Sequence, residues 1–378
     1  MIRTILLGDV VEIIKGISYR SADYSDSENG IAFVNLKSVA RGGGYNPDGI
    51  KYYAGQIKPS QYVEPGDILI ANTDLTQNRE VIGSPIIMPD IGRSACFSLD
   101  LSKIIVTDIE VVDHRYLFYY LKSPIAREYM LAHSNGSTVM HLSVKAVPNM
   151  EINLPPLDQQ KKIANILGSL DEKIEFNRRM NKTLEQLGQA LFRHYFVDKA
   201  RQSNGNIQTI PLGKKLHPKR GRSLQARDMI CGDTPVISGG LKPAGFHNEA
   251  NTTAPVITIS ASGANAGFVS VWGEPVWSAD SSYIDSTITK YAYTYYLFLK
   301  NKQKEIYDMQ TGSGQPHIYP KHIEILEIAD LSDCEFNDFE QRVRPLFDMI
   351  HENKKQIDYL SNIRDSLLPK LISGEIEI

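Results

Sequence analysis

Two long stretches of the chain carry apolar side chains at alternating steps of four and three residues. The first stretch follows Leu154-Pro155-Pro156-Leu157, and the second begins near Phe336. This rhythm is typical of a coiled-coil seam rather than of the broader stripe of a helix that lies on a globular core. The seam positions are Ile163, Leu167, Leu170, Ile174, Asn177, Asn181 and Leu184 in the first stretch, and Leu346, Ile350, Asn353, Ile357, Leu360 and Leu367 in the second. The pattern predicts two helices of about 35 residues, each roughly 50 Å long.

The sequence also suggests where these helices begin and how they pair. Asp158, after a Pro-Pro pair, and Asn337, three residues before Glu340, are expected N-caps. Pro345 lacks a backbone donor, so we expect it to kink the second helix or to delay its start. Asn177 and Asn353 interrupt the apolar seam, and we interpret them as polar residues that fix the helix register rather than as ligand-binding groups.

A duplicated segment of domain length precedes the two helices. Residues 136–145, GSTVMHLSVK, recur 176 residues later at 312–321 as GSGQPHIYPK, with Gly, Ser, His and Lys in identical places. The aromatic stretch at 116–122 corresponds to that at 294–300, and Leu7-Gly8 corresponds to Leu212-Gly213. A period this long excludes a solenoid, whose units are roughly 20–45 residues. It therefore indicates two copies of a whole domain.

The expected organisation is domain, helix, domain, helix, with boundaries at 1–155, 156–200, 201–335 and 336–378. The segments 66–70 and 255–259 read as strands entered from turns, and Ser123-Pro124 is expected to open a helix that ends near Ala132. We expect the aromatic side chains to pack in the cores, with a DNA contact as the alternative: Tyr116, Tyr119, Tyr120, Tyr295 and Tyr296. The predicted fold class is α/β (α+β): two similar domains and two helices paired as an antiparallel coiled coil with pseudo-twofold symmetry.

Composition limits the class of protein without identifying it. The 378 residues, 42% hydrophobic and 22% charged, suit a globular protein of two or more domains. No apolar run approaches the roughly 20 residues of a membrane span, and the N-terminus does not resemble a signal peptide, so we expect a cytoplasmic protein without membrane contact. Three scattered cysteines outside any CxxC pair argue against zinc. The net charge of −3 gives no support for nucleic-acid binding.

The sequence lacks the common motifs of catalysis. It contains no GxxxxGK[ST] phosphate loop, no Asn-Pro-Pro-aromatic tetrapeptide of adenine methyltransferases, and no HExxH or GxSxG motif. A nuclease-like set could be assembled from Pro89-Asp90 and Asp171-x-Lys173, but it would join a loop to a helix of another module. We therefore expect no catalysis, and no cofactor or metal, in this chain.

The order of these features resembles the specificity subunits of type I restriction-modification enzymes. The resemblance covers essentially the whole chain and rests on the helix signatures LPPLDQQKKIANIL and EQRVRPLFDMI with LLPKLISGE. It also rests on LGDV, EPGDILIANTDLT, Ile237-Ser238-Gly239-Gly240 and the duplicated GST–H–K stretch. Each motif is weak by itself, whereas their order and duplication are specific.

The resemblance implies a sequence-specific DNA-binding subunit. Each domain would recognise one part of an asymmetric, bipartite site in double-stranded DNA, and the paired helices would set the length of the unread spacer. Two modification subunits would dock on it and carry S-adenosylmethionine and adenine methylation, while restriction subunits would cleave DNA with ATP and Mg. Two readers on a rigid bar reach the same duplex face only near helical-turn multiples.

Candidate DNA contacts lie in polar loops of both domains. In the first domain, Arg41 is the first residue of the glycine-rich segment RGGGYN, whose glycines would allow close approach to a groove. Four further residues have the chemistry to read adenine or guanine edges: Asn72, Thr73, Asn78 and Arg79. Turn formation is the alternative for these four, and it is the favoured one for Asn72. Ser137, Thr138, His141 and Lys145 belong to the duplicated loop, whose short side chains would let backbone amides approach phosphate; a structural role for the histidine is the alternative.

The second domain offers corresponding candidates. Ser262 and Asn265 lie in ISASGANAG, and Gln315, His317 and Lys321 belong to the second copy of the loop. Lys214, Lys215, Lys219, Arg220 and Arg222 form a dense basic cluster, for which a solvated loop is the alternative to phosphate contact.

Two other functions remain as alternatives at this point. One is a stand-alone nuclease, methyltransferase or bipartite DNA-binding protein outside a restriction system. The other is a coiled-coil adaptor without a DNA role. The missing catalytic motifs argue against an enzyme, and the duplicated polar loops argue against a simple adaptor.

Overall fold

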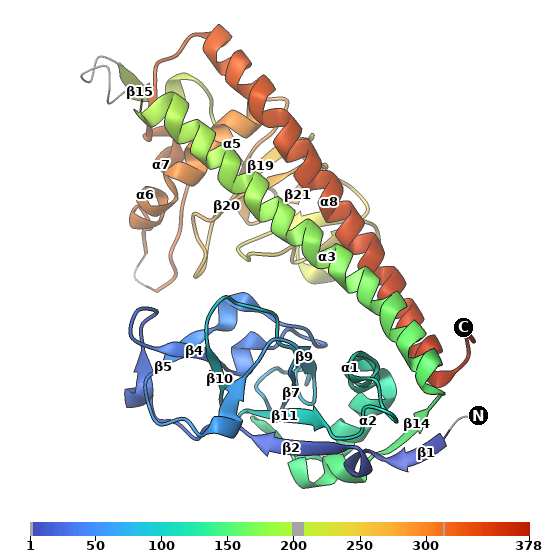
Figure 1. Ribbon diagram of the computed structural model, residues 1–378. Helices are drawn as coiled ribbons and strands as arrows, with labels where there is room; N and C mark the ends of the chain where they lie inside the picture. The colour runs from blue at the N-terminus through green and yellow to red at the C-terminus, as the bar shows by residue number, and fades with distance from the viewer. Residues whose placement is uncertain (1–2, 199–207, 313) are drawn as a thin grey trace. The chain divides into compact units, whose positions relative to one another are not determined.

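The computed structural model describes residues 3–198, 208–312 and 314–378. The chain divides into two compact units, one formed by Met1–Lys173 with Tyr359–Ile378 and the other by Ile174–Asp358. Each unit holds one β-rich domain together with parts of both long helices (Figure 1). Each unit is described by itself.

The two long helices confirm the prediction from the hydrophobic pattern. Helix α3 spans Leu157–Phe192, followed by a π-helical turn at Arg193–Asp198, and helix α8 spans Asp333–Ser373. The two helices pack together, α3 in green and α8 in red in Figure 1. The predicted stretch 156–200 ends in residues 199–200, which lie outside the described residues.

The expected start signals of both helices are wrong in detail. Helix α3 begins at Leu157, so Asp158 lies in its first turn, where its charge still favours the positive end of the helix dipole. Helix α8 begins four residues before Asn337: the Ser332 hydroxyl receives the Glu335 amide at 3.3 Å, and the Glu335 carboxylate receives the Ser332 amide at 2.9 Å. Helix α8 also runs through Pro345, so this proline does not delay the start of the helix.

The first unit contains four small sheets around two short helices. Its helices are α1 (His114–Lys122) and α2 (Pro124–Ala132), with Ser123 as the predicted cap of α2. The strands, in sheet order, are β1 (Arg3–Leu6) with β14 (Glu151–Leu154); β3 (Tyr24–Ser25), β5 (Lys51–Tyr53), β4 (Ile31–Val34), β10 (Ala95–Phe97) and β6 (Tyr62–Val63); β2 (Val11–Lys15), β11 (Leu101–Val106), β7 (Ile68–Ala71) and β9 (Pro85–Ile87); and β12 (Ser134–Asn135), β13 (Met140–Leu142) and β8 (Thr73–Asp74).

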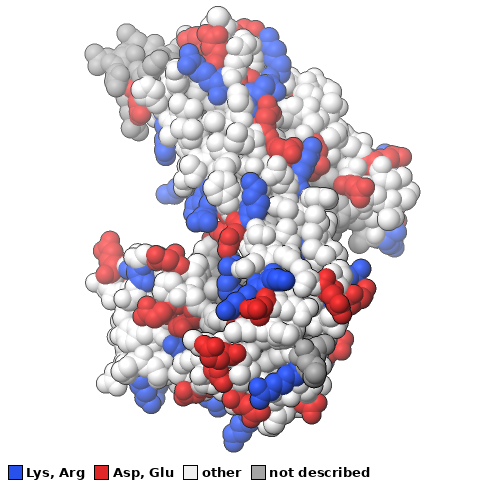
Figure 2. Space-filling model, turned by 45° about the vertical axis from the view of Figure 1, so that its right-hand side comes forward, with Lys and Arg blue, Asp and Glu red and all other residues white. Residues whose placement is uncertain are grey.

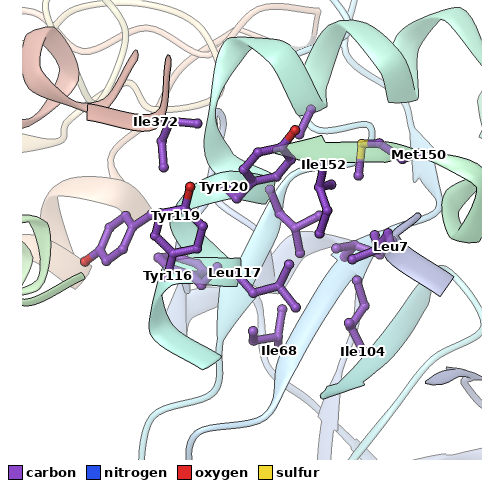
Figure 3. Close-up of a cluster of buried hydrophobic side chains, with 14 of the residues drawn as sticks. Leu7, Ile68, Ile104, Tyr116, Leu117, Tyr119, Tyr120, Met150, Ile152 and Ile372 are labelled. Atoms are coloured by element: carbon purple, nitrogen blue, oxygen red, sulfur yellow. The ribbon is translucent and has the colours of Figure 1, made fainter. Parts of the chain in front are cut away.

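The main core of the first unit joins these sheets to the helices. Helix α1 presents an unbroken buried run from Tyr116 to Leu121, as expected for its aromatic residues. Ile68 and Ile104 come from the adjacent strands β7 and β11, and Ile372 comes from α8 (Figure 3). The end of the second long helix is therefore part of the first domain's core. Burial of this kind supplies the dominant stabilising free energy.

The second unit repeats this plan with fewer strands. Its helices are α5 (Ala292–Asn301), α6 (Gln303–Asp308) and α7 (Pro320–Glu324). Its strands, in sheet order, are β15 (Thr209–Pro211) with β23 (Glu327–Ala329); β16 (Lys219–Arg220), β22 (Ser281–Ile284), β19 (Val256–Ser260) and β20 (Val269–Trp272); and β18 (Gly245–His247), β17 (Thr234–Ile237) and β21 (Trp277–Ser278).

Strand connectivity confirms that the domains are two copies of one fold. In each unit the opening strand pairs antiparallel with the strand that precedes the closing long helix, β1 with β14 and β15 with β23. Each unit also has a four-stranded sheet in the same order and one parallel pair, β4 with β10 and β17 with β21. The core of the second unit is closed by the buried helix α5, which packs on Phe339, Val343 and Phe347 of α8.

The seam between the helices has an apolar end in the first unit and a polar patch in the second. Six of the thirteen predicted seam residues are buried and seven are partly buried: Ile163, Leu167, Ile174, Asn177, Ile350 and Asn353 in the first group, and Leu170, Asn181, Leu184, Leu346, Ile357, Leu360 and Leu367 in the second. In the second unit the Asn177 amide donates to Gln356 Oε1 at 3.2 Å, and Asn353 donates to Asn181 Oδ1 at 2.9 Å. These bonds place α3 and α8 antiparallel and suit the predicted role in fixing register.

Candidate functional site

A three-stranded ribbon gathers the polar candidates of the first unit. His141 in β13 pairs with Thr73 in β8 on one side and with Asn135 in β12 on the other. His141 is exposed, and the ribbon ends in a loop that carries the exposed Ser137 and Thr138. Gly136 has a φ of +125°, and a Cβ there would lie 2.0 Å from the Val139 carbonyl oxygen, so this loop needs glycine.

A rigid loop follows Thr73 and displays two further candidates. The buried Asp74 carboxylate accepts the backbone amides of Thr76 at 2.6 Å, Val81 at 2.6 Å and Ile82 at 2.8 Å. The tip of the loop exposes Asn78 and Arg79, and Arg79 adopts a φ of +56°. Arg79 therefore starts from a fixed backbone, which lowers the entropy lost when its side chain binds a partner.

The hydrogen bonds of Asp74 make a pH-dependent stability prediction. Burial acts to raise the pKa of Asp74, but the hydrogen bonds from Thr76, Ile82 and Val81 outweigh it, and the pKa lies below its ordinary value. A depressed pKa in the folded protein stabilises it above the ordinary aspartate pKa, and that stabilisation is lost as the pH falls through the folded-state pKa. We expect Asp74→Asn to lower the free energy of unfolding by about 1–3 kcal/mol at neutral pH, because one amide cannot accept three backbone donors.

Urea unfolding of wild type and variant at several pH values tests this prediction. The difference between them should stay constant above about pH 5 and shrink as the pH falls below the ordinary aspartate pKa of about 3.9 towards the lower folded-state pKa. The exposed Asp48 provides the control, since Asp48→Asn should change little at any pH. A difference for Asp74→Asn that does not depend on pH would contradict the assignment.

The glycine-rich loop of Arg41 lies against the Asp74 loop. The Gly42 amide donates to the Glu80 carbonyl oxygen at 2.9 Å, and the Arg41 guanidinium is 3.0 Å from the Glu80 carboxylate. Arg41 is mostly exposed, so this ion pair stabilises little and its guanidinium is accessible. The structure thus brings Arg41, Asn78 and Arg79 to neighbouring loops although about 35 residues separate them along the chain.

Two candidates of the first unit occupy other positions. Asn72 is 6% exposed, and its amide donates to the Leu99 carbonyl oxygen at 3.1 Å, which favours the structural alternative for this residue. Lys145 is exposed in a 3-10 helix at Val144–Asn149, just after the ribbon strand of His141.

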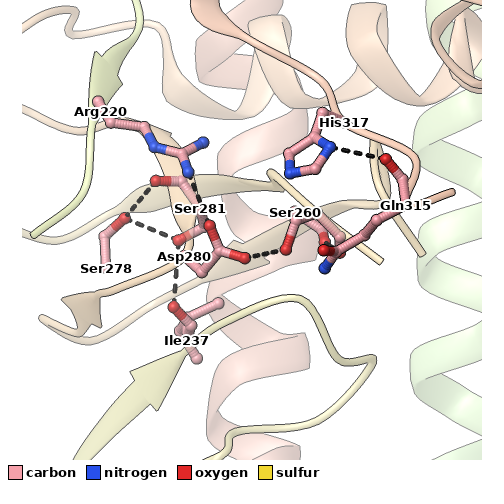
Figure 4. Close-up of polar contacts among 9 residues, drawn as sticks. Arg220, Ile237, Ser260, Ser278, Asp280, Ser281, Gln315 and His317 are labelled. Atoms are coloured by element: carbon pink, nitrogen blue, oxygen red, sulfur yellow. Dashed lines mark hydrogen bonds and ion pairs between the residues drawn. The ribbon is translucent and has the colours of Figure 1, made fainter. Parts of the chain in front are cut away.

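The second unit repeats the arrangement around His317. His317 forms antiparallel bridges with Ser262 on one side and Thr311 on the other, just as His141 does with Thr73 and Asn135. Gly312 has a φ of +102°, and a Cβ there would lie 2.5 Å from the Gln315 carbonyl oxygen, which matches Gly136 and Val139. The His317 ring nitrogen Nδ1 lies 2.7 Å from that same Gln315 oxygen (Figure 4). Ser313, part of the duplicated pattern, lies outside the described residues.

The other candidates of the second unit surround this bridge. Gln315 is exposed, Asn265 is partly buried in the loop after Ser262, and Lys321 is exposed in α7. Lys219 and Arg220 form the edge strand β16. All five members of the basic cluster are exposed, and two of them are also ion-paired: Lys215 with Asp330 at 2.8 Å, and Arg220 with Asp280 at 2.7 Å.

One duplicated residue, Asp100 with its counterpart Asp280, was not among the predicted site residues. Asp100 accepts the Thr73 hydroxyl at 3.2 Å, and Asp280 accepts the Ser262 hydroxyl. The signal was present as FSLDLS at 97–102 and WSADSS at 277–282, which share the order aromatic, Ser, any residue, Asp, any residue, Ser at an offset of 180. A single Asp in a short turn resembles an ordinary turn residue, so the motif is recognisable only from the repeat.

Charges of both signs are distributed over the surface. On the face shown in Figure 2, Lys and Arg alternate with Asp and Glu. Within residues 3–198, 208–312 and 314–378, no group of three or more His, Cys, Asp or Glu side chains could hold a metal ion. In the same residues, no helix is long and apolar enough to span a bilayer.

Two similar β-rich domains, each followed by a long helix and each presenting the same polar ribbon, define a duplicated recognition protein. Residues 3–186 match the family described as "Type I restriction modification DNA specificity domain". The chain is 26% identical over 298 residues to the MjaIX specificity subunit of Methanocaldococcus jannaschii, covering 70% of this chain and 69% of that one. It is 29% identical over 241 residues to the HindI specificity subunit of Haemophilus influenzae, covering 61% of this chain and 47% of that one.

A solved structure shows the same fold. The S subunit of a type I restriction-modification system from M. genitalium superposes with a TM-score of 0.62 over 98% of this chain and 96% of its own, at 20% identity. Residues 3–186, nearly half of the chain, thus belong to the family of type I restriction modification DNA specificity domains, and the chain is similar over most of its length to specificity subunits, which are non-catalytic within the type I complex.

Proposed function

We propose that this chain reads a bipartite, asymmetric site in double-stranded DNA, with one half-site for each domain. The domains at 1–155 and 201–335 act as the two readers, and the helices at 156–200 and 336–378 fix the distance between them. One observation carries the proposal: both units hold the same ribbon around His141 or His317, yet the exposed side chains beside the ribbon differ. The shared ribbon would let both domains bind DNA in the same way, and the different side chains beside it would let each domain recognise a different base sequence.

The accessible side chains have the chemistry for both kinds of DNA contact. Asn78 and Arg79 in the first unit can bond bidentately to adenine and guanine edges in the major groove, and Gln315 in the second unit can do the same with adenine. The residues that recur in both units, or that are basic and exposed, suit contact with phosphate, which positions a protein without reading sequence. They are Arg41, Ser137, His141, Lys145, Lys219, Arg222, His317 and Lys321, and we add Thr138, which is exposed beside Ser137 in the same loop.

Partner subunits would supply the chemistry that this chain lacks. We propose that two modification subunits bind the complex and carry S-adenosylmethionine, and that restriction subunits with ATP and Mg join them. Mixed surface charge is consistent with partners that provide much of the phosphate contact. We propose that the chain acts in the cytoplasm, where its DNA target lies.

Selection from a random duplex pool tests the proposed function. The chain assembled with its modification subunits should enrich duplexes that carry two short conserved blocks separated by a spacer of fixed length and free sequence. A stand-alone reader would enrich such duplexes without modification subunits. Enrichment of no sequence by the assembled complex would contradict the proposal and favour an adaptor.

The duplicated lysines give a further prediction. If Lys145 and Lys321 contact phosphate, each change to Ala should weaken binding to all duplexes alike and reduce the salt dependence by about one counterion. Titration of the assembled complex at several salt concentrations measures both effects, and the exposed Lys304 serves as the control. An altered base preference without a change in the salt slope would show that these lysines act on bases instead.

A further inference from the structure

Both units contain the same carboxylate at the same structural position. Asp100 lies in the turn from β10 to β11, and Asp280 lies in the turn from β21 to β22. In each unit a glycine from another segment of the chain packs against this turn. The Gly16 amide donates to the Leu101 carbonyl oxygen at 3.3 Å, and the Gly221 amide donates to the Ser281 carbonyl oxygen at 2.8 Å.

The close contact at this turn leaves no room for a side chain at the position of either glycine. A Cβ on Gly16 would lie 2.1 Å from the Ser98 carbonyl oxygen, and a Cβ on Gly221 would lie 2.4 Å from that of Ser278. Neither glycine has a positive φ, so the need for glycine comes from this contact and not from backbone conformation. The position of the carboxylate is therefore fixed in the same way in both units.

Each carboxylate holds the residue that faces the ribbon histidine. The Thr73 hydroxyl donates to Asp100 Oδ1 at 3.2 Å, and the Ser262 hydroxyl donates to Asp280 Oδ2. Thr73 and Ser262 are the strand partners of His141 and His317. In each unit the carboxylate, the hydroxyl residue and the histidine thus connect three segments that are distant in sequence. The histidine end of this arrangement lies at the polar surface of the unit.

The second oxygen of the carboxylate has different partners in the two units. In the first unit, Asp100 Oδ2 accepts the hydroxyls of Tyr19 at 3.2 Å and Ser98 at 3.3 Å. Burial, together with hydrogen bonding and charge, raises the pKa of Tyr19, so Tyr19 keeps its proton and remains a donor. The donors around Asp100 are therefore neutral hydroxyls.

In the second unit a guanidinium replaces these neutral donors. Arg220 Nη2 donates to Asp280 Oδ1 at 2.7 Å, and both side chains remain about 40% exposed (Figure 4). The pair cancels the carboxylate charge and holds the planar fork of Arg220 at the edge of the site, where its N–H groups can donate to an acceptor. The two units thus present opposite polarity at equivalent positions, an acceptor in the first and a donor in the second.

We propose that Asp100 and Asp280 determine specificity at equivalent positions of the two half-sites, and that they do so with opposite polarity. This inference rests on the proposed function. Asp100 accepts an exocyclic amino group and so favours cytosine or adenine, the two bases that present one in the major groove. Asp280 positions Arg220, which favours guanine through its O6 and N7 acceptors. In both units the carboxylate also fixes the hydroxyl beside the histidine.

Methylation maps of variants, each produced in cells with the modification subunits, test the proposal. Asp280→Asn and Ser262→Ala should each reduce discrimination at one position of the second half-site by roughly 10-fold to 100-fold and leave the first half-site unchanged. Asp100→Asn and Thr73→Ala should do the same at one cytosine or adenine of the first half-site. Ser262→Thr should retain wild-type specificity, because Thr73 has the same role in the first unit.

Controls separate this role from a structural one. The exposed Asp48 and Asp308 belong to the two units, and changing either to Asn should leave both half-sites intact. Thermal unfolding of each complex shows whether a variant is folded. Unchanged base discrimination in Asp280→Asn and Ser262→Ala would overturn this inference but not the proposed function. A uniform loss of methylation in these variants, with the recognised motif unchanged, would do the same. A wild-type complex without a bipartite motif would overturn the proposed function, and this inference with it.

Discussion

Insertion of four residues after Glu175 should lengthen the unread spacer and leave both half-site sequences unchanged. Glu175 is exposed on α3, which is one continuous helix from Leu157 to Phe192. Four residues add about 6 Å to a helix, against about 3.4 Å for each base pair, so the spacer should grow by one or two base pairs. Methylation at the original site should fall to background, while methylation at the lengthened site appears.

A matched second insertion preserves the helix seam if the single insertion disturbs it. Asn177 bonds to Gln356, so Glu175 lies opposite Asp358 in the antiparallel pair. Four residues after Glu175 together with four after Asp358 would keep these amide contacts in register. Four residues inserted after Gly92, in an exposed turn, serve as the control and should leave the spacer as it was. Altered half-sites with an unchanged spacer would contradict the role of the helices.

Phe347→Ala should lower the free energy of unfolding of the second unit by about 3–5 kcal/mol. Phe347 is 1% exposed, and its ring stacks on Tyr293 at 4.7 Å and meets the edge of Tyr296 at 5.4 Å. Truncation would leave a cavity between α8 and α5 and remove two aromatic contacts.

Fluorescence isolates this effect, because both tryptophans, Trp272 and Trp277, belong to the second unit. Urea unfolding followed by tryptophan emission should show the loss for Phe347→Ala and a change of at most about 0.5 kcal/mol for Met349→Ala, a residue of the same helix that is 49% exposed. Similar losses for the two variants would show that the α5 contact does not stabilise the unit.

Phe347 also shows what the repeat in the sequence can and cannot predict. The repeat places Phe347 at the position of Asp171 in the first long helix, since 176 residues separate them. Asp171 contacts the aromatic helix of its own unit by a different chemistry: its carboxylate accepts the Tyr119 hydroxyl at 2.9 Å and pairs with Arg364 at 2.6 Å. Periodicity predicts that both helices pack there, but the nature of the contact depends on side chains from other segments.

The same reasoning separates the correct predictions from the wrong ones. The seam spacing, the aromatic cores and the domain duplication depend on local pattern and repetition, and the structure confirms them. The start of α8 was wrong because Ser332 with Glu335 makes a better cap than Asn337. The expectation that Pro345 delays the start of α8 was wrong, because α8 begins at Asp333, twelve residues before the proline, and a kink at Pro345 stays a prediction.

The candidate site was predictable only in part. The repeat identified His141 with His317 and the glycine that each loop requires. It did not show that Thr73 and Ser262 are their strand partners, because strand pairing between distant segments leaves no local pattern. Asp100 and Asp280 left a signal in the repeated FSLDLS and WSADSS motifs, but their contacts with Thr73 and Ser262 follow only from the folded structure.

The central claim is that the two domains of this chain read two separate blocks of DNA. Mapping of methylated adenines in cells that contain only this chain and its modification subunits tests it most directly. The account predicts methylation within a motif of two defined blocks separated by a fixed stretch of any sequence. Methylation within a single continuous motif, or at adenines without any common sequence, would contradict it.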